Sequence, residues 1–315
     1  VARNEEFFAA QGTPQSRFVA ESFTDSLLAS APVASLPHPE TKALLIEAGA
    51  LLIADIPGYL TRLETAFRLP FALDRANSAV VKAIAQAQQS AIEVRAHYAV
   101  PKLPAPPLKP AAEPMPAPPK AVPDPRSAFL HFRYTLAPLP AEPMRPRLAD
   151  ERVGYFTAAR VDYTDDTAAK PRTHYARRWR LEKKDPQAAV SAPRQPILFW
   201  LDRNIPEKYR RAVTEGVLEW NKAFERIGFK DAIVVRQQVG EDDIEQGEAR
   251  RAVVRWFTGA DVGFAIGPSR ADPRTGETLA ADIGMSDVFG RGARRLVAED
   301  LAPRAHGAQQ GAELC

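Results

Sequence analysis

The segment from Pro196 to Phe229 constrains the fold more than any other stretch of the chain. It begins with five large apolar residues, Ile197–Leu201, which predict a buried strand. Pro206 suits the first turn of a following helix because it lacks an N–H, and Gly228 tolerates the positive φ that ends such a helix. Between them, apolar side chains at three- and four-residue spacing predict one stripe that packs on a sheet. The stripe comprises Tyr209, Ala212, Val213, Gly216, Val217, Trp220, Ala223, Phe224 and Ile227.

Further strands are predicted after this helix. The runs 232–235 and 252–257 are rich in β-branched and aromatic residues, and a shorter glycine-bearing strand is expected at 262–267. Asp272–Gly276 has the composition of a turn, after which a last strand is expected over 278–285. A sheet with a backing helix, preceded by a β-rich region, predicts an α+β fold.

Prolines mark an internal boundary, because they occupy 11 of the 25 positions from 101 to 125. Neither a helix nor a central strand tolerates that density, so residues 101–126 are expected to form an extended connector. We expect residues 1–100 and 127–190 on either side of it to form a β-rich accessory domain. Residues 191–315 would then hold the sheet and helix described above.

The accessory region contains three clear patterns and one ambiguous pattern. Residues 92–98 and 129–136 alternate apolar and polar side chains, as half-buried strands do, and 59–67 has helical spacing. The two apolar runs within 43–54 fit either a hairpin or a buried helix, and periodicity alone does not separate these alternatives.

Composition argues against several classes of function. The net charge of +3 is small for 315 residues and gives no indication of nucleic-acid binding. The basic cluster at 170–184 is expected to be a solvated face paired with nearby acidic residues; a nucleic-acid interface there would show a steep salt dependence. Cys315 is the single cysteine, so there is no internal disulfide, and no apolar run approaches the roughly 20 residues of a membrane span.

The motifs of metal and nucleophilic catalysis are also missing from the sequence. The five histidines are His38, His97, His131, His174 and His306, and no two lie three to five residues apart. There is no H-E-x-x-H, the motif that places two imidazoles on one helical face for zinc. Gly284–Asp287 lacks the second glycine of G-x-S-x-G, so no catalytic or metal-binding residue is assigned.

Several blocks in the same order nevertheless resemble a known family. The chain is similar, over roughly residues 71–300, to bacterial, exported zinc-dependent metalloproteases of metzincin-like type, whose N-terminal halves carry only a domain-of-unknown-function label. The similarity is densest between residues 153 and 287. The blocks are Val153–Phe156, Arg178–Pro186, the strand and helix of 196–229, Gly267–Glu277 and Ala281–Ile283.

The resemblance implies a fold and a role. In such proteases a strand, a long backing helix and two strands precede an edge strand that pairs with an extended polypeptide substrate. Here that edge would consist of Gly263, Phe264, Ala265, Ile266 and Gly267. The helix with H-E-x-x-H, which should follow, is not in this sequence, so residues 191–315 are expected to be the N-terminal half of a truncated protease domain.

The resemblance leaves two functional hypotheses. The first is the N-terminal part of a zinc metalloprotease, periplasmic or extracellular, which is inactive alone because zinc belongs to the intact family member. The second is a non-catalytic peptide-binding or scaffold protein that uses the same edge strand. In both, the partner is an extended polypeptide, with no nucleic acid and no membrane span. An uncovered sheet face is expected to favour self-association.

Overall fold

The computed structural model describes residues 1–86, 89–105, 117–240, 251–259 and 265–301. It divides into two compact units, Val1–Ala176 and Arg177–Cys315, which are described separately below. Helices and strands occur together in both units, so the class is α+β, as the sequence predicts. The described part of the chain contains no helix long and apolar enough to cross a bilayer.

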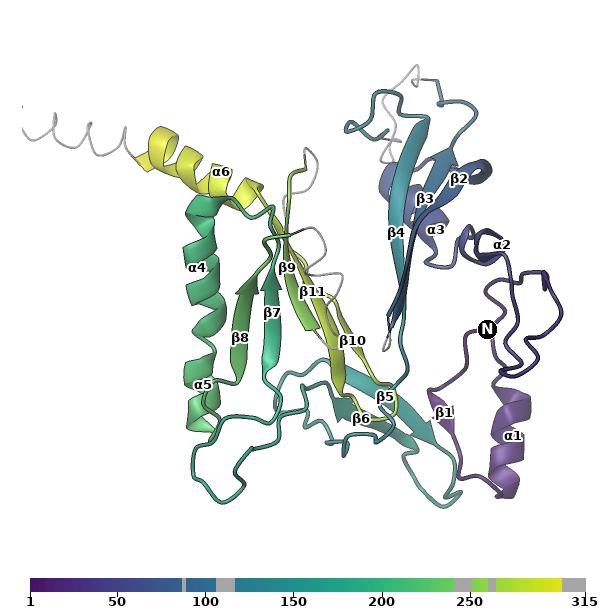
Figure 1. The fold of residues 1–315 in the computed structure, drawn as a ribbon, viewed down its shortest axis with the longest axis vertical. Coiled ribbons are helices and arrows are strands. Elements are labelled where there is room, and N and C mark those ends of the chain that lie inside the picture. Colours follow the sequence, from purple (N-terminus) through teal and green to yellow (C-terminus); the bar gives the residue numbers. More distant parts are fainter. Residues whose placement is uncertain (87–88, 106–116, 241–250, 260–264, 302–315) are drawn as a thin grey trace, which may run out of the picture. The chain divides into compact units, whose positions relative to one another are not determined.

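The first unit contains a small sheet of three strands (Figure 1). The central strand β5 (Thr157–Asp162) pairs in parallel with β1 (Phe7–Phe8) and antiparallel with β6 (Arg172–Ala176). Helix α1 (Pro14–Ser22) is capped by the Thr13 hydroxyl, which accepts a hydrogen bond from the Ser16 N–H at 3.2 Å. Residues 153–156, one of the blocks that carry the family resemblance, lie just before β5 rather than in a strand.

A second sheet of the same unit is an antiparallel meander of β2 (Ala72–Ala85), β3 (Ser90–Ala99) and β4 (Ser127–Leu136). The alternation of 92–98 and 129–136 therefore predicted both strands correctly. Helix α3 (Tyr59–Phe67) also forms where expected. Of the two ambiguous runs, the second overlaps the short helix α2 (Ala48–Leu52), whereas the first is not helical and pairs through Ile46 with Val33, so neither alternative holds for both. The proline-rich segment joins β3 to β4, and its described residues contain neither helix nor strand.

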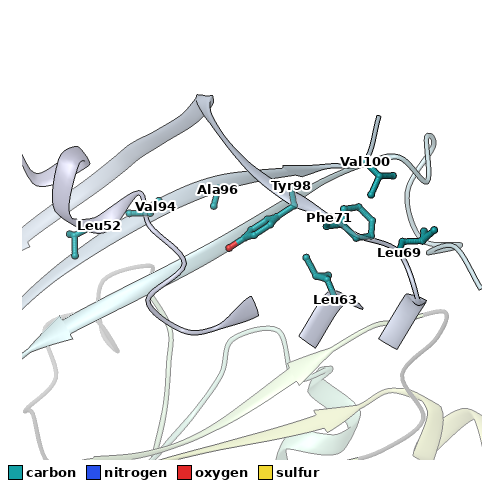
Figure 2. Close-up of a cluster of buried hydrophobic side chains, with 8 residues drawn as sticks. All are labelled: Leu52, Leu63, Leu69, Phe71, Val94, Ala96, Tyr98 and Val100. Atoms are coloured by element: carbon teal, nitrogen blue, oxygen red, sulfur yellow. The ribbon is translucent and has the colours of Figure 1, made fainter. Parts of the chain in front are cut away.

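The core of the first unit lies between these helices and one face of β3 (Figure 2). Burial follows the period of the strand, because alternate side chains of β3 point to the same face. Tyr98 is fully buried, and its hydroxyl donates to Asp55, whose carboxylate also accepts the N–H groups of Tyr59 and Leu60 at the start of α3. Burial is the main cause that raises the pKa of Tyr98. The buried cluster consists of Leu52, Leu63, Leu69, Phe71, Val94, Ala96, Tyr98 and Val100.

The second unit is built on a five-stranded sheet in the order β10-β11-β9-β7-β8. Its strands are β7 (Ile197–Leu201), β8 (Ile233–Gln237), β9 (Arg251–Phe257), β10 (Ser269–Ala271) and β11 (Thr278–Ser286). All neighbours are parallel except β10, which is antiparallel to β11 and forms one edge. The predicted strands at 197–201, 232–235, 252–257 and 278–285 are thus confirmed to within two residues.

Helices α4 (Glu207–Leu218) and α5 (Asn221–Arg226) run along one side of this sheet, and α6 (Val288–Arg295) with the π-helical turn η1 (Leu296–Leu301) follows β11 (Figure 1). Leu201, Ile205 and Val254 are buried between sheet and helix, with Tyr209, Val213 and Val217 packed against them. Tyr209 stacks on Trp256 of β9 with ring centroids 5.4 Å apart. This cluster is the core that positions the edge strand.

The prediction of one continuous helix with Trp220 at its interface was wrong. The helix is interrupted after Leu218, and Trp220 is 66% exposed. Ala212, Gly216, Ala223 and Ile227 are exposed as well. Asn221 takes the inward position instead. Its side chain donates to the Ile233 carbonyl at 3.0 Å and accepts from the Ile233 N–H at 2.8 Å. Phe224 remains half-buried, and Gly228 ends the segment with φ of +89°, as expected.

Candidate peptide-binding edge

The predicted edge segment is described only in part. Gly263 and Phe264 lie outside the described residues, whereas Ala265, Ile266 and Gly267 are described and are all exposed. The regular edge strand of the described residues is β10, which starts at Ser269, two residues after the predicted segment ends. The three described residues contribute one isolated antiparallel bridge, between Ile266 and Gly284 of β11.

Pro268 explains why the edge splits into a bridge and a strand. Ile266 exchanges two backbone hydrogen bonds with Gly284, at 3.0 and 2.7 Å, and the Pro268 carbonyl accepts the Asp282 N–H at 3.0 Å. The next paired residue is Ser269, opposite Ala281, so one register holds from Ile266 to Arg270 and shifts only between Arg270 and Ala271. Pro268 cannot return a hydrogen bond to β11, and the ladder is interrupted at that single position.

The same register determines which backbone groups face outward. In an antiparallel pair, residues that exchange both bonds alternate with residues whose N–H and C=O point away from the partner strand. Because Ile266 and Pro268 face β11, Gly267 and Ser269 direct their backbone groups off the sheet edge. The proline therefore occupies an inward position and leaves the outward row of donors and acceptors intact.

Side chains along this edge differ between the two faces of the sheet. The helix-covered face receives only small ones, from Ala265, Gly267, Ser269 and Ala271. A Cβ added to Gly267 would meet one neighbour, Ile283 Cγ1 at 3.6 Å, which packs against the core of the second unit. A strand added to this edge would thus find space for large apolar side chains on that face.

The opposite face carries charge. Asp282 of β11 lies 3.1 Å from the Arg270 guanidinium and 3.7 Å from that of Arg255, and both arginines are exposed. Two cations share one carboxylate, so this part of the face has a positive excess. The strand pairing places Arg251 and Arg236 on the same face.

A buried polar turn fixes the hairpin that carries the edge. Asp272 is fully buried, and Arg274 donates to both of its carboxylate oxygens, at 3.0 and 2.7 Å. Burial alone would raise the pKa of Asp272, but the hydrogen bonds from the Arg274 side chain and N–H outweigh it and lower the pKa. Gly276 has φ of +75°, as the predicted turn requires. These hydrogen bonds fix the conformation of the turn, which joins β10 to β11.

The basic segment after residue 176 holds this turn from outside the hairpin. Arg178 exchanges backbone hydrogen bonds with Gly276 and Thr278, at 3.0 and 2.8 Å. Arg180 makes a two-pronged ion pair with Glu277, whose side chain is only 1% exposed. The expectation that this cluster merely pairs with nearby acidic residues on a solvated face was therefore wrong for Arg180, which has a structural partner almost a hundred residues away.

The described residues contain no group of three or more histidine, cysteine, aspartate or glutamate side chains that could hold a metal ion. His306 lies outside them. The residues that are described therefore do not fit a zinc site, and no chemical step through zinc is derived for this chain.

One arrangement of reactive side chains was missed at the sequence level. Asp74, His97 and Ser127 come together on neighbouring strands of the first unit and form a chain of hydrogen bonds. Their separations of 23 and 30 residues match no local motif, and only the strand pairing of β2, β3 and β4 brings them together.

Comparison with known proteins gives one match. Residues 2–184, more than half of the chain, match the profile of a domain of unknown function, DUF5117. No curated protein matches the chain, and no solved structure does.

Proposed function

This chain belongs to the DUF5117 family, and from that premise we propose that its second unit is the substrate-binding half of a zinc-dependent metalloprotease of metzincin-like type. In this proposal the edge formed by Ala265–Ala271 pairs with an extended polypeptide. The observation that carries the proposal is the register of Ile266 with Gly284, which leaves Gly267 and Ser269 free to pair outward.

The order of elements supports the protease relationship. Strand β7, helices α4 and α5, strands β8 and β9, edge strand β10 and strand β11 follow one another as the resemblance implies. Among the described strands of this sheet, β10 is the one that pairs antiparallel with its neighbour. A described edge of seven residues spans about 23 Å, at about 3.3 Å per residue, which is long enough for a short peptide strand.

The two faces of the edge define the peptide that fits best. On the helix-covered face, the small residues around Gly267 leave room for apolar side chains against Ile283. On the other face, Arg270 and Arg255 favour acidic side chains. The preferred substrate is thus an extended segment with alternating apolar and acidic residues.

Binding and cleavage are separate properties in this proposal. Because the sequence contains no H-E-x-x-H, the chain alone is expected to bind such a segment without hydrolysing it. A non-catalytic peptide-binding protein would use the same edge in the same way. Chelator-sensitive turnover of casein by the purified chain would contradict this expectation.

The direct test is fluorescence anisotropy with a labelled peptide of alternating valine and glutamate. Gly267→Pro removes one outward N–H and should weaken binding about 2- to 10-fold, the effect of one hydrogen bond. Pro268→Ala, one residue away, alters only the inward side and should leave the affinity unchanged. Equal effects of both substitutions, or no binding by the unaltered chain, would overturn the proposal.

A fold check accompanies these variants. All four tryptophans, Trp179, Trp200, Trp220 and Trp256, lie in the second unit, so their fluorescence reports its integrity selectively. Loss of binding counts only where the thermal transition seen by this fluorescence is preserved.

A further inference from the structure

A Ser-His-Asp chain of hydrogen bonds lies on the face of the β2–β3–β4 sheet opposite the core. Asp74 is the cross-strand partner of His97, and its Oδ2 lies 2.9 Å from His97 Nδ1. On the other side, Ser127 Oγ lies 2.8 Å from His97 Nε2. With Nδ1–H donating to the carboxylate, Nε2 is the acceptor for the serine proton. This is the order of contacts that activates a serine nucleophile.

A distortion of β2 holds the aspartate in place. The register between β2 and β3 shifts between Asp74 and Ala79, so the residues between them bulge out of the ladder. From this bulge, Asn77 Nδ2 donates to Asp74 Oδ2 at 2.7 Å, and Ser78 Oγ accepts the His97 N–H at 2.9 Å. The side-chain hydrogen bonds that Asp74 receives, from Asn77 first and from His97 second, lower the pKa of Asp74 to about 2. The carboxylate therefore stays ionised at neutral pH.

The three side chains remain reachable from solvent. His97 and Asp74 keep 13% and 30% of their side chains exposed, and Ser127 is half-buried. Exposed Phe129 lies beside the imidazole, with ring centroids 4.8 Å apart. The site is thus an open surface with one apolar contact.

We propose that Ser127 is a nucleophile that accepts acyl groups from small activated esters, with His97 as general base and Asp74 as the positioning residue for the imidazole. Phe129 offers contact to a short apolar acyl chain. This activity is independent of the peptide-binding edge of the second unit.

The reaction balances without a cofactor. Ser127 Oγ bonds to the ester carbonyl carbon while its proton passes to His97 Nε2. The bond from that carbon to the leaving oxygen then breaks, and His97 returns the proton to the departing alcohol. Water repeats the sequence on the acyl-serine: its proton goes to His97, its oxygen bonds to the carbonyl carbon, and Ser127 leaves with the proton.

The structure also limits the rate of the proposed acyl transfer to Ser127. The Ser127 N–H donates to the Asp124 carbonyl at 3.0 Å, so it is not available to stabilise an oxyanion as the nucleophile's own N–H does in serine proteases. The remaining enhancement is that of general-base catalysis, about 10²- to 10⁴-fold. This magnitude suits esters with good leaving groups and not peptide bonds.

The test is labelling of the full chain with a fluorophosphonate, followed by mass mapping of the modified peptide. The expected result is one adduct, at Ser127, which Ser127→Ala removes and unfolding in urea prevents. A chain that is not labelled at Ser127, or is labelled there equally fast in urea, overturns the proposal. The unaltered chain decides this outcome, so it does not depend on whether a variant folds.

Two further variants test the roles of the partners. His97→Gln should slow labelling by at least about tenfold while the circular dichroism spectrum is preserved. Asp74→Asn should slow labelling and abolish the downfield NMR signal of the His97 Nδ1 proton, a signature that a purely structural loss elsewhere in the sheet would not remove. Labelling at unchanged rates in both folded variants would contradict the assigned roles.

Discussion

Glu277 and Arg180 form a two-pronged ion pair that ties the start of β11 to the segment after residue 176. The distances are 3.0 Å from Nε to Oε1 and 2.6 Å from Nη2 to Oε2, and the carboxylate is buried. Parallel hydrogen bonds of this kind fix both the distance and the plane of the two groups. The pair therefore contributes to holding the hairpin of β10 and β11 in one orientation.

Removal of the negative charge of Glu277 should lower the free energy of unfolding of the second unit. Glu277→Gln removes the negative charge that the Arg180 guanidinium grips with two hydrogen bonds, and breaking a buried pair in this way costs about 3–5 kcal/mol. Because a quarter of the Arg180 side chain is exposed, we expect a smaller loss of about 2–3 kcal/mol in the free energy of unfolding of the second unit. Urea unfolding followed by tryptophan fluorescence measures it.

Glu182→Gln is the matched control for this prediction. Glu182 pairs with Arg194 at 4.0 Å, and both side chains are more than half exposed. Such a pair contributes at most about 1 kcal/mol. Similar losses in the two variants would mean that burial does not set the strength of the Arg180–Glu277 pair.

The sequence predicted most of the second unit because its strands carry their own signal. The runs at 197–201 and 252–257 are apolar and rich in β-branched or aromatic residues, and the turn Asp272–Gly276 has its aspartate, proline and glycine in place. The phase of the helix was not predictable from spacing alone. Trp220 fits the apolar stripe, yet the pairing of Asn221 with the Ile233 backbone turns it outward.

Substitutions at the neighbouring residues Trp220 and Asn221 should therefore differ in their effect on the free energy of unfolding. Asn221→Ala removes both hydrogen bonds to Ile233 and leaves backbone groups unsatisfied, so it should destabilise the unit by about 1–3 kcal/mol. Trp220→Ser changes an exposed side chain and should stay within about 0.5 kcal/mol. Urea unfolding followed by circular dichroism compares them. A larger loss for Trp220→Ser would restore the original prediction of a buried tryptophan.

Two other features of the structure could not be predicted from the sequence. Pro268 lacks the N–H that would have made the ladder continuous between Ile266 and β10, and the pairing partner of Pro268 follows only from the register. Asp74, His97 and Ser127 meet because β2, β3 and β4 pair in one particular register. Long-range pairing of this kind has no counterpart in local spacing.

The acidity of Asp74 gives a test of the hydrogen-bonded chain by NMR. Because its pKa is lowered to about 2, the carboxylate stabilises the folded first unit above the unfolded pKa of about 3.9, and this contribution is lost as the pH falls toward 2. A carboxyl-carbon titration should show its midpoint near 2. Asn77→Ala should raise that midpoint, since Asn77 is the largest cause, whereas Ser127→Ala should not. A midpoint near 4 in the unaltered chain would contradict the geometry.

The charged face of the edge gives the sharpest test of substrate preference, and it assumes the proposed peptide binding. The unaltered chain should bind a valine–glutamate peptide more tightly than a valine–lysine peptide, by about 3- to 10-fold at low salt, and the difference should shrink as salt is added. Arg270→Glu should reverse this preference, because it replaces the cation nearest the edge beside Asp282. Arg226→Glu, the same charge change on α5, should leave it unaltered. Binding of both peptides with no preference would refute the acidic specificity alone, whereas binding of neither would refute the edge itself.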